Sequence, residues 1–551
     1  MPTQPNVLWI TMEDTSPRFG CYGDDLARTP NIDDLAAEGR RYSNAFTTAP
    51  VCAPSRSAAM TGCYQQSLGT HHMRTTHTND DAPGLATPYD AVPPHYVRTV
   101  SEYFRQAGYY CTNNVKTDYQ FGEPFTAWDD HHDQAGWWGR DGEDRPFFAM
   151  FNNTVTHESG MWPPEERAEL LAETGKDFGD LPTEGPLETD PGAVDVPPYL
   201  PDTEATRRSI ARQYENVHAS DAWVGELLDR LEREGLAENT IVVLWSDHGE
   251  GLPRAKRWPY DSGIRVPLLI RWPGEVDGGE VSDRMVSMVD LAPTLLSACG
   301  LDIPQHMDGQ RFLGENTEPR KYVFAARDRY DESYDMIRVV RDDRYKYIQN
   351  YYPGQPYRQW IPFRNRHPAM RDLLRRDAAD NLDGAERWVA RTRPAEELYH
   401  LRTDPHETEN LIDDPDHAAA RDRLRSVLDE WLARVDQFAA EDESAMTRRR
   451  HLGAGEAVTA TPTFIPNAPG NRGREATPDG AELESPATVS IHCSTQGASI
   501  GYTTDGGPDP DWELYTGPVA LDPGETTIRT KAIRYGFEES DEREATFTII
   551  D

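Results

Sequence analysis

The first 300 residues alternate short apolar runs with longer stretches of helical periodicity. The clearest runs are Asn6–Met12, Pro146–Phe151 and Thr240–Ser246, each of a length typical of a buried strand. Before the third run, apolar residues recur at helical spacing and end before Gly235: Ile210, Tyr214, Val217, Val224, Leu227, Leu228 and Leu231. Strands that alternate with helices predict an α/β domain of the doubly wound kind, with a largely parallel sheet flanked by helices.

The pattern changes at about residue 321. Short aromatic-rich runs follow and predict a small antiparallel sheet: Tyr322–Ala326, Met336–Val340 and Tyr345–Asn350. Beyond them, apolar residues at helical spacing mark an amphipathic helix packed on that sheet: Leu424, Val427, Leu428, Trp431, Leu432 and Val435. We therefore place an α/β domain at residues 1–320 and a C-terminal subdomain at 321–440.

A polar stretch rich in Arg, Gly and Pro at residues 441–479 has no sustained periodicity, which predicts a linker. After it, short alternating runs are divided by Gly, Pro and Asp clusters: Thr488–His492, Ser499–Thr503, Pro518–Leu521, Thr526–Ile533 and Glu544–Ile550. This spacing is typical of a β-sandwich, which we place at residues 480–551. We found no internal repeat.

Length and charge narrow the class of function. A chain of 551 residues exceeds one hydrophobic core, and its net charge of -38 would repel phosphate backbones and anionic headgroups, so we expect no nucleic acid or membrane partner. Arginine carries nearly all the positive charge, since the lysines are only Lys116, Lys176, Lys256, Lys321, Lys346 and Lys531. This surface chemistry is typical of a halophilic source, although a GC-rich genome explains it about as well.

The beginning of the sequence and the spacing of the cysteines indicate in which cellular compartment we expect the protein. Met-Pro-Thr-Gln-Pro leads directly into the first apolar run with no basic or apolar leader, so we expect a cytoplasmic protein, or a secreted one if a leader was trimmed. No apolar run approaches the length of a membrane-spanning helix. The six cysteines show no paired spacing, which indicates neither a disulfide framework nor a zinc site.

Acidic residues follow two of the predicted strands directly. The first strand runs into Glu13-Asp14, and the strand at Thr240–Ser246 runs into Asp247-His248. Parallel strands bring their carboxyl ends to one edge of a sheet, where open α/β folds bind ligands. Either pair alone is explained as well by helix capping. Together, three carboxylates and an imidazole predict a hard divalent-cation site, suited to calcium or magnesium.

The segment Val51-Cys52-Ala-Pro-Ser-Arg56 carries the most specific signal. It contains the pattern C-x-P-S-R and lies downstream of Thr29–Asp33 and Tyr42–Phe46. These phrases together resemble type I sulfatases of the alkaline-phosphatase superfamily, with heparan N-sulfatase-like and arylsulfatase-like enzymes nearest. The resemblance implies that Cys52 is oxidised to formylglycine by a maturation enzyme, and that the modified residue supplies the nucleophile and a metal ligand.

Three further positions match motifs of that family. Lys116-Thr-Asp118 matches a Lys-x-His motif with Asp118 in place of the histidine, His157 follows the strand Pro-Phe-Phe, and Lys256 precedes Tyr-Asp-Ser-Gly. The resemblance implies that Arg56 holds the modified residue and that Lys116 and Lys256 bind sulfate oxygens. His157 and Lys256 are then candidates for the acid that protonates the leaving group. Asp118 is either a replacement base or a structural residue, and Glu13 is a weaker metal ligand than Asp14.

The substrate is a sulfated carbohydrate in this interpretation. The module at residues 480–551 resembles the fibronectin-III-like C-terminal domain of chitobiases, and His71, His72 and Arg74 are candidate sugar or carboxylate contacts. Because the module holds none of the motif residues, we expect a chain ending near residue 450 to retain hydrolysis of a small aryl sulfate. The alternatives are a formylglycine-dependent phosphonate or phosphate-diester hydrolase, and a carbohydrate-binding pseudoenzyme with unmodified Cys52.

Overall fold

A computed structural model describes residues 4–142, 144–174, 185–435, 438–450, 457–469 and 475–550. Its largest sheet has eight strands in the order β4-β3-β5-β1-β6-β7-β2-β8. Their bounds are β1 Asn6–Met12, β2 Arg40–Phe46, β3 Tyr110–Asn114, β4 Asp130–His131, β5 Phe147–Asn153, β6 Thr240–Ser246, β7 Leu268–Arg271 and β8 Glu280–Ser287. Only β7 runs antiparallel to its neighbours, which confirms the prediction of a largely parallel sheet.

The central strands are apolar on both sides because helices cover both faces of the sheet. Along β1, Val7 and Trp9 belong to one buried cluster, and Leu8 and Ile10 belong to another. The first face packs against α2 (Cys52–Thr61), α4 (Val100–Gln106) and α8 (Leu291–Ala298), and the second against α1 (Pro30–Glu38) and α6 (Glu204–Arg233). A doubly covered parallel sheet explains the continuous apolar runs in the sequence.

A second sheet follows in the order β12-β11-β10-β9 and is antiparallel throughout. Its strands are β9 Val323–Arg327, β10 Ile337–Arg341, β11 Tyr345–Asn350 and β12 Glu396–His400. Helix α11 (Ala418–Val435) covers one face, where Trp431 stacks on Phe324 with ring centroids 4.8 Å apart. The other α-helices before α11 are α3 Gln65–Leu68, α5 Pro164–Thr174, α7 Asp261–Ile264, α9 Pro362–Asn365 and α10 Pro368–Ala378.

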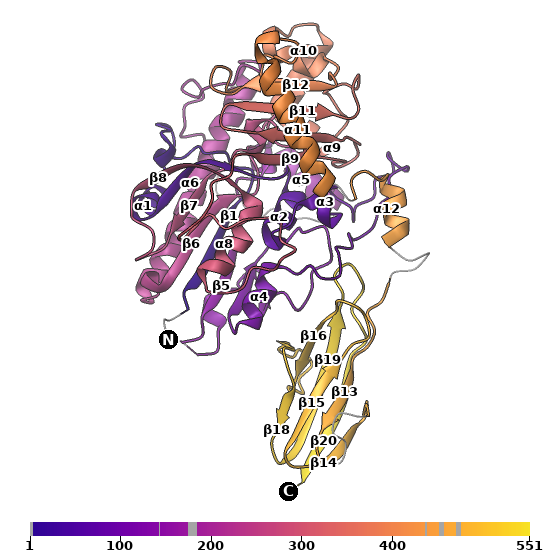
Figure 1. The fold of residues 1–551 in the computed structure, drawn as a ribbon. Helices are drawn as coiled ribbons and strands as arrows, with labels where there is room; N and C mark the ends of the chain where they lie inside the picture. The colour runs from indigo at the N-terminus through magenta and orange to yellow at the C-terminus, as the bar shows by residue number, and fades with distance from the viewer. Residues whose placement is uncertain are drawn as a thin grey trace.

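The C-terminal residues form a β-sandwich that projects from the large domain, with the C-terminus at its far end (Figure 1). One sheet holds β13 Thr463–Asn467, β15 Ala487–His492 and β18 Val519–Leu521. The other holds β14 Gly480–Glu484, β16 Ser499–Thr503, β17 Glu513–Leu514, β19 Gly524–Ile533 and β20 Arg543–Ile550. Alternate residues of both sheets enclose a core that includes Phe464, Val489, Ile528 and Phe547.

The stretch at 441–479 differs from the linker predicted there. Helix α12 (Glu443–Arg450) carries Glu443, which pairs with Arg329 at 2.7 Å, and β13 belongs to the sandwich. Neither element is long or apolar enough to show a periodic pattern, so tertiary contacts rather than sequence pattern define both. Residues 451–456 and 470–474 of the predicted linker lie outside the described residues.

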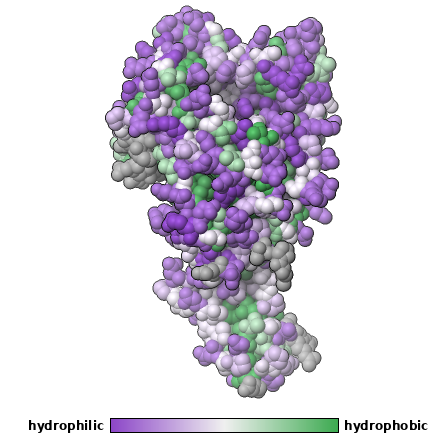
Figure 2. Space-filling model, turned by 90° about the vertical axis from the view of Figure 1, so that its left-hand side faces the viewer, coloured by the Kyte–Doolittle hydropathy of each residue, from purple (hydrophilic) through white to green (hydrophobic). Residues whose placement is uncertain are grey.

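Hydrophilic residues cover most of the molecular face seen in Figure 2, with larger apolar areas on the narrow sandwich end. Within the described ranges, no helix combines the length and hydropathy needed to cross a bilayer.

Candidate active site

The parallel pairing of β1 with β6 builds the base of the site. Met12 lies opposite Ser246, so the next residues of each strand, Glu13-Asp14 and Asp247-His248, emerge side by side. The backbone of Asp14 takes a left-handed conformation (φ 46°). Such a strained geometry occurs at functional sites where the surrounding contacts enforce it. The Asp14 N–H donates to Asp247 Oδ1 (3.2 Å), which fixes one strand end against the other.

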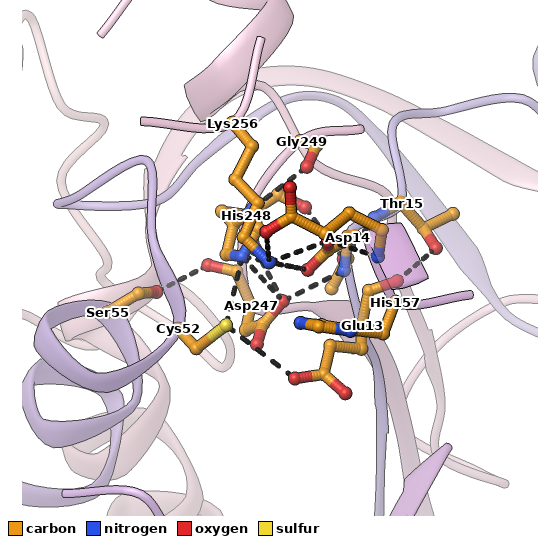
Figure 3. A network of polar contacts seen from close by, with 12 residues as sticks. Glu13, Asp14, Thr15, Cys52, Ser55, His157, Asp247, His248, Gly249 and Lys256 are labelled. Atoms are coloured by element: carbon orange, nitrogen blue, oxygen red, sulfur yellow. Dashed lines mark hydrogen bonds and ion pairs between the residues drawn. The ribbon is translucent and has the colours of Figure 1, made fainter. Parts of the chain in front are cut away.

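Helix α2 brings Cys52 to these strand ends. Val51 is extended, and the helix begins at Cys52, which places the side chain at its amino end facing Glu13 and His248 (Figure 3). Cys52 Sγ lies 3.3 Å from His248 Nε2 and 3.6 Å from Glu13 Oε1. Burial raises the pKa of the thiol, despite the opposing charges of Lys116 and Lys256. An unmodified Cys52 is therefore a protonated, weakly nucleophilic thiol at neutral pH.

The donor set around Cys52 suits a hard divalent cation. Ligand atoms lie within 4.8 Å of one another in two overlapping groups, Glu13–Asp14–Cys52–His157 and Cys52–Asp247–His248. Burial opposes the charged form of His248, yet the carboxylates of Asp247 and Asp14 outweigh it and hold the imidazole pKa well above its ordinary value. So negative an environment is one that a cation stabilises. The oxygen-rich donors fit calcium or magnesium, and the predicted ligands come together as expected.

Each carboxylate of this group is also paired with a cationic side chain. Arg56 Nε donates to Asp247 Oδ2 (2.9 Å), Lys256 Nζ to Asp14 Oδ2 (2.7 Å), and Lys116 Nζ to Glu13 Oε1. Arg56 and Asp247 are completely enclosed, whereas the Lys116 side chain keeps 22% of its exposure. The three cations surround the Cys52 side chain, where they provide positive charge for an anionic group bound above it.

The two candidate acids differ in protonation. The pKa of His157 is lowered to about 4, mainly by burial and then by the charge of Lys256. The carboxylate of Asp14 opposes this shift but is the weaker influence. For Lys256, burial favours the neutral form, but Asp14 and Glu158 raise the pKa above its ordinary value. The surrounding charges therefore favour the protonated form of Lys256 and the neutral form of His157.

Residues beyond the sequence motifs extend the network outward. Lys256 Nζ contacts Glu158 Oε1 (3.1 Å), and Glu158 binds Arg257 through both carboxylate oxygens. Asp331 then joins Arg257 Nε (3.1 Å) to Arg74 Nε (2.6 Å). Glu158 and Arg257 are direct sequence neighbours of His157 and Lys256, which is the one signal that could have found them. Asp331 has no motif around it.

Arg74 reaches the site, but the two histidines predicted with it do not. Besides Asp331, Arg74 contacts the ring of Phe363 at 4.9 Å, and Phe363 lies 5.9 Å from the His157 ring. His71 and His72 are enclosed elsewhere, where burial lowers the pKa of each to about 3. The charges that act on both belong to Arg329 and Glu443, outside the group around Cys52. The prediction that His71 and His72 contact substrate is therefore corrected, because polar residues after α3 fold inward.

Asp118 lies on a strained loop beside Lys116. Its Oδ2 is 3.4 Å from Lys116 Nζ, and its side chain keeps 29% of its exposure. Burial opposes ionisation, but Lys116, Arg56 and Arg74 lower the pKa of Asp118. The φ angles of Val115 (68°), Asp118 (57°) and Gln120 (65°) are all positive, so the loop holds a conformation that neighbours must enforce.

Comparisons with known proteins agree with this geometry. A family model described as Sulfatase matches residues 5–301, one described as N-sulphoglucosamine sulphohydrolase, C-terminal, matches 249–369, and one described as Chitobiase/beta-hexosaminidase C-terminal domain matches 478–544. The chain is 39% identical to a ulvan-active sulfatase of Formosa agariphila over 98% of this chain and 91% of that protein. It is 28% identical to human N-sulphoglucosamine sulphohydrolase over 77% and 89%.

The fold also matches solved structures. A structure described as BT4656 in complex with its substrate D-glucosamine-2-N,6-O-disulfate has a TM-score of 0.54 and 19% identity, over 80% of this chain and all of that one. A structure described as a 2-O GAG sulfatase, BT1596, has a TM-score of 0.55 and 21% identity, over 79% and 93%. Both likenesses concern the α/β architecture.

Proposed function

Because the chain belongs to the sulfatase family, as its match to the family model over residues 5–301 and its 39% identity to a ulvan-active sulfatase show, we propose that it removes sulfate esters from an anionic polysaccharide. The family makes it a hydrolase of sulfate esters. The proposal adds the polymeric, carboxylate-bearing substrate, the formylglycine at Cys52 and the calcium or magnesium ion.

The observation that carries the proposal is the position of Cys52. It lies at the amino end of α2, within 4.8 Å of carboxylate and imidazole ligand atoms, with Lys116, Lys256 and Arg56 around it. A sulfate ester is an unreactive anion, so its cleavage needs a strong nucleophile, neutralisation of its oxygens and protonation of the leaving oxygen. The residues around Cys52 are suited to these three tasks.

The chain's own residues divide the work as follows. Formylglycine at Cys52 would supply the nucleophilic hydroxyl, and a divalent cation held by Glu13, Asp14, Asp247 and His248 would supply Lewis-acid charge. Arg56 donates a hydrogen bond to Asp247 and holds that carboxylate in place. Lys116 and Lys256 bind the sulfate oxygens, and Lys256 delivers its proton to the leaving oxygen.

Two features support a carboxylate-bearing polysaccharide. Asp331 binds the Nε of Arg74, and the guanidinium lies over the ring of Phe363, which in turn contacts the His157 ring. A guanidinium fork binds carboxylates in a bidentate manner. The names of relatives support the carbohydrate part of this proposal, because one is a ulvan-active sulfatase and another is an N-sulphoglucosamine sulphohydrolase.

The test couples the chemical state of Cys52 to activity. Mass spectrometry of the Cys52 peptide should show a loss of about 18 Da in active preparations, the change from thiol to aldehyde. Turnover of an aryl sulfate should follow the modified fraction, and Cys52→Ala should be inactive. Full turnover from wholly unmodified protein would overturn the mechanism.

A substrate panel separates the remaining alternatives. The proposal expects turnover of sulfated oligosaccharides that contain uronic acid, and faster hydrolysis of an aryl sulfate than of an aryl phosphonate diester. The opposite preference would favour a phosphonate or phosphate-diester hydrolase. Binding of the oligosaccharides without turnover by fully modified protein would favour a carbohydrate-binding protein.

A further inference from the structure

The C-terminal sandwich is joined to the catalytic domain by a dense contact surface rather than by a linker alone. Arg98 Nη2 donates to Gly497 O (2.7 Å), Arg105 Nη2 to Trp512 O (2.9 Å), and Arg534 Nη2 to Pro93 O (2.8 Å). Guanidinium groups thus cross the boundary in both directions and end on backbone carbonyls. Such contacts fix the relative position of two backbones, not only of two side chains.

Close backbone approach at glycines makes the contact specific. A Cβ at Gly501 would lie 2.4 Å from Phe125 Cε2, and a Cβ at Gly536 would lie 2.6 Å from Ala91 O. Lys531 Nζ lies 4.2 Å from the centroid of the Phe125 ring. Since a side chain at Gly536 would meet backbone and one at Gly501 would displace the Phe125 ring, the sandwich fits this surface of the catalytic domain closely.

Tyr535 extends from the sandwich into the core of the catalytic domain. Its side chain is completely buried and belongs to the same apolar cluster as Val7 and Trp9 of strand β1. The ring stacks on Phe121 with centroids 5.4 Å apart, and its hydroxyl lies 3.2 Å from Thr99 Oγ1. A module that only tethered the enzyme to carbohydrate would not need this insertion.

Phe121 closes the strained loop that carries Lys116 and Asp118. Its ring contacts Tyr119 at 5.7 Å, and Tyr119 is itself buried next to Asp118. A second contact of the loop comes from Gln120, whose carbonyl accepts the N–H of Ala91 (2.7 Å), the residue against which Gly536 lies. Two of the loop's contacts therefore lead to the sandwich, one through Tyr535 and one through Gly536. Others, such as Gln120 Nε2 to His72 O, stay within the catalytic domain.

We infer that the C-terminal sandwich is a brace for the substrate loop, and that Tyr535 is a positioning residue that holds Lys116 and Asp118 toward the sulfate. The backbone strain at Val115, Asp118 and Gln120 must be balanced by surrounding contacts, and the sandwich supplies them. This inference predicts the opposite of the expectation from the sequence that a chain ending near residue 450 retains hydrolysis of a small aryl sulfate. The inference rests on the proposed role of Lys116 and Asp118.

The test uses full-length variants with modified Cys52. Tyr535→Ala should lower kcat/KM for a small aryl sulfate about tenfold to a hundredfold, because displacement of a catalytic group by about 1 Å has effects of that size. Tyr535→Phe keeps the ring stack and should restore most of the activity. Tyr502→Ala, a matched tyrosine whose ring contacts Tyr515 within the sandwich, should leave activity unchanged.

Gly501→Val provides a second variant that leaves the core of both parts intact. Its side chain should wedge Phe125 away from the sandwich and lower activity in the same way. Hydrogen exchange supplies a readout that does not depend on turnover: amides of residues 115–121 should exchange faster in Tyr535→Ala and Gly501→Val, with β1 and β6 unchanged. Unaltered exchange of this loop in both folded variants would overturn the brace. Faster exchange without any sulfatase activity in the wild type would instead count against the proposed function.

Discussion

The charged side chains around Cys52 form pairs of one carboxylate and one cation. Asp14, Asp247 and Glu13 each face the ligand cluster and are each bound from the other side by a lysine or arginine. Removing one carboxylate takes away one of the partners of a cation at the site, and a buried ion pair that loses one partner costs up to about 3–5 kcal/mol. Loss of activity in an alanine variant at these positions therefore mixes lost chemistry with lost stability, and amide substitutions are the better probes.

Asp118→Asn tests whether this carboxylate is a base. Asparagine keeps the shape of the side chain but cannot take a proton, so release of sulfate should become slow while release of the alcohol product remains fast. Stopped-flow measurement with an aryl sulfate should then show a burst of the aryl product followed by slow turnover. A steady-state rate equal to that of the wild type would assign Asp118 to the structure of the loop.

Arg74→Lys tests recognition of a second anionic group. Lysine keeps the charge but loses the planar fork, so kcat/KM for a uronate-containing sulfated oligosaccharide should fall about tenfold to a hundredfold, the loss of a charge-assisted hydrogen bond. Hydrolysis of an aryl sulfate that carries no carboxylate serves as the internal control and should stay within about twofold. Equal losses on both substrates would place Arg74 in the support of Arg257 and Asp331 instead.

The arrangement of the strands explains which site residues the sequence can predict and which it cannot. Glu13, Asp14, Asp247 and His248 were predictable together because parallel strands deliver their carboxyl ends to one edge. Cys52 and Lys256 were identified through local motifs. Asp331, by contrast, reaches Arg257 across the boundary with the second sheet, a contact that depends on the packing of two domains and leaves no local pattern.

Polarity misled the prediction where polar residues are buried. His71 and His72 look like surface residues in the sequence, but the turn after α3 folds them beneath Arg329 and Glu443. Helix α12 was missed for a related reason. Its contacts include the buried ion pair of Glu443 with Arg329 and a small apolar cluster of Met446 with Tyr89 and Phe438, which leave no periodic apolar face in the sequence.

That ion pair makes α12 sensitive to acid. Burial opposes ionisation of Glu443, but His72 and Arg329 outweigh it and lower the carboxyl pKa from 4.5 to about 2. A depressed folded-state pKa contributes stability above pH 4.5 that disappears as the pH falls toward 2. Glu443→Gln should thus reduce the free energy of unfolding at pH 7 by about 3–5 kcal/mol, with a smaller difference at pH 3.

Denaturant titrations at the two pH values measure this difference. Asp343→Asn is the matched control, because Asp343 pairs with Arg402 at the surface and should contribute less than about 1 kcal/mol at either pH. A Glu443→Gln effect that is independent of pH would mean that the carboxylate charge does not hold α12.

The net charge is the dominant property of the whole molecule. A formal charge of -38 produces self-repulsion that destabilises the compact state, and salt screens it because the Debye length shortens from about 10 Å at 0.1 M to about 3 Å at 1 M. We therefore expect the melting temperature to rise between 0.1 and 1 M, equally with NaCl and KCl. A melting temperature that falls or stays constant would remove the evidence for adaptation to saline conditions.

The insertion of Tyr535 links the order of synthesis to the onset of activity. Its hydroxyl contacts Thr99, a residue 436 positions earlier in the chain. During translation, the eight-stranded sheet and every residue around Cys52 emerge from the ribosome well before the sandwich does. Until then, the loop that carries Lys116 and Asp118 lacks its brace, so a nascent chain holds all the chemical groups of the enzyme but becomes competent only when the sandwich has folded against them.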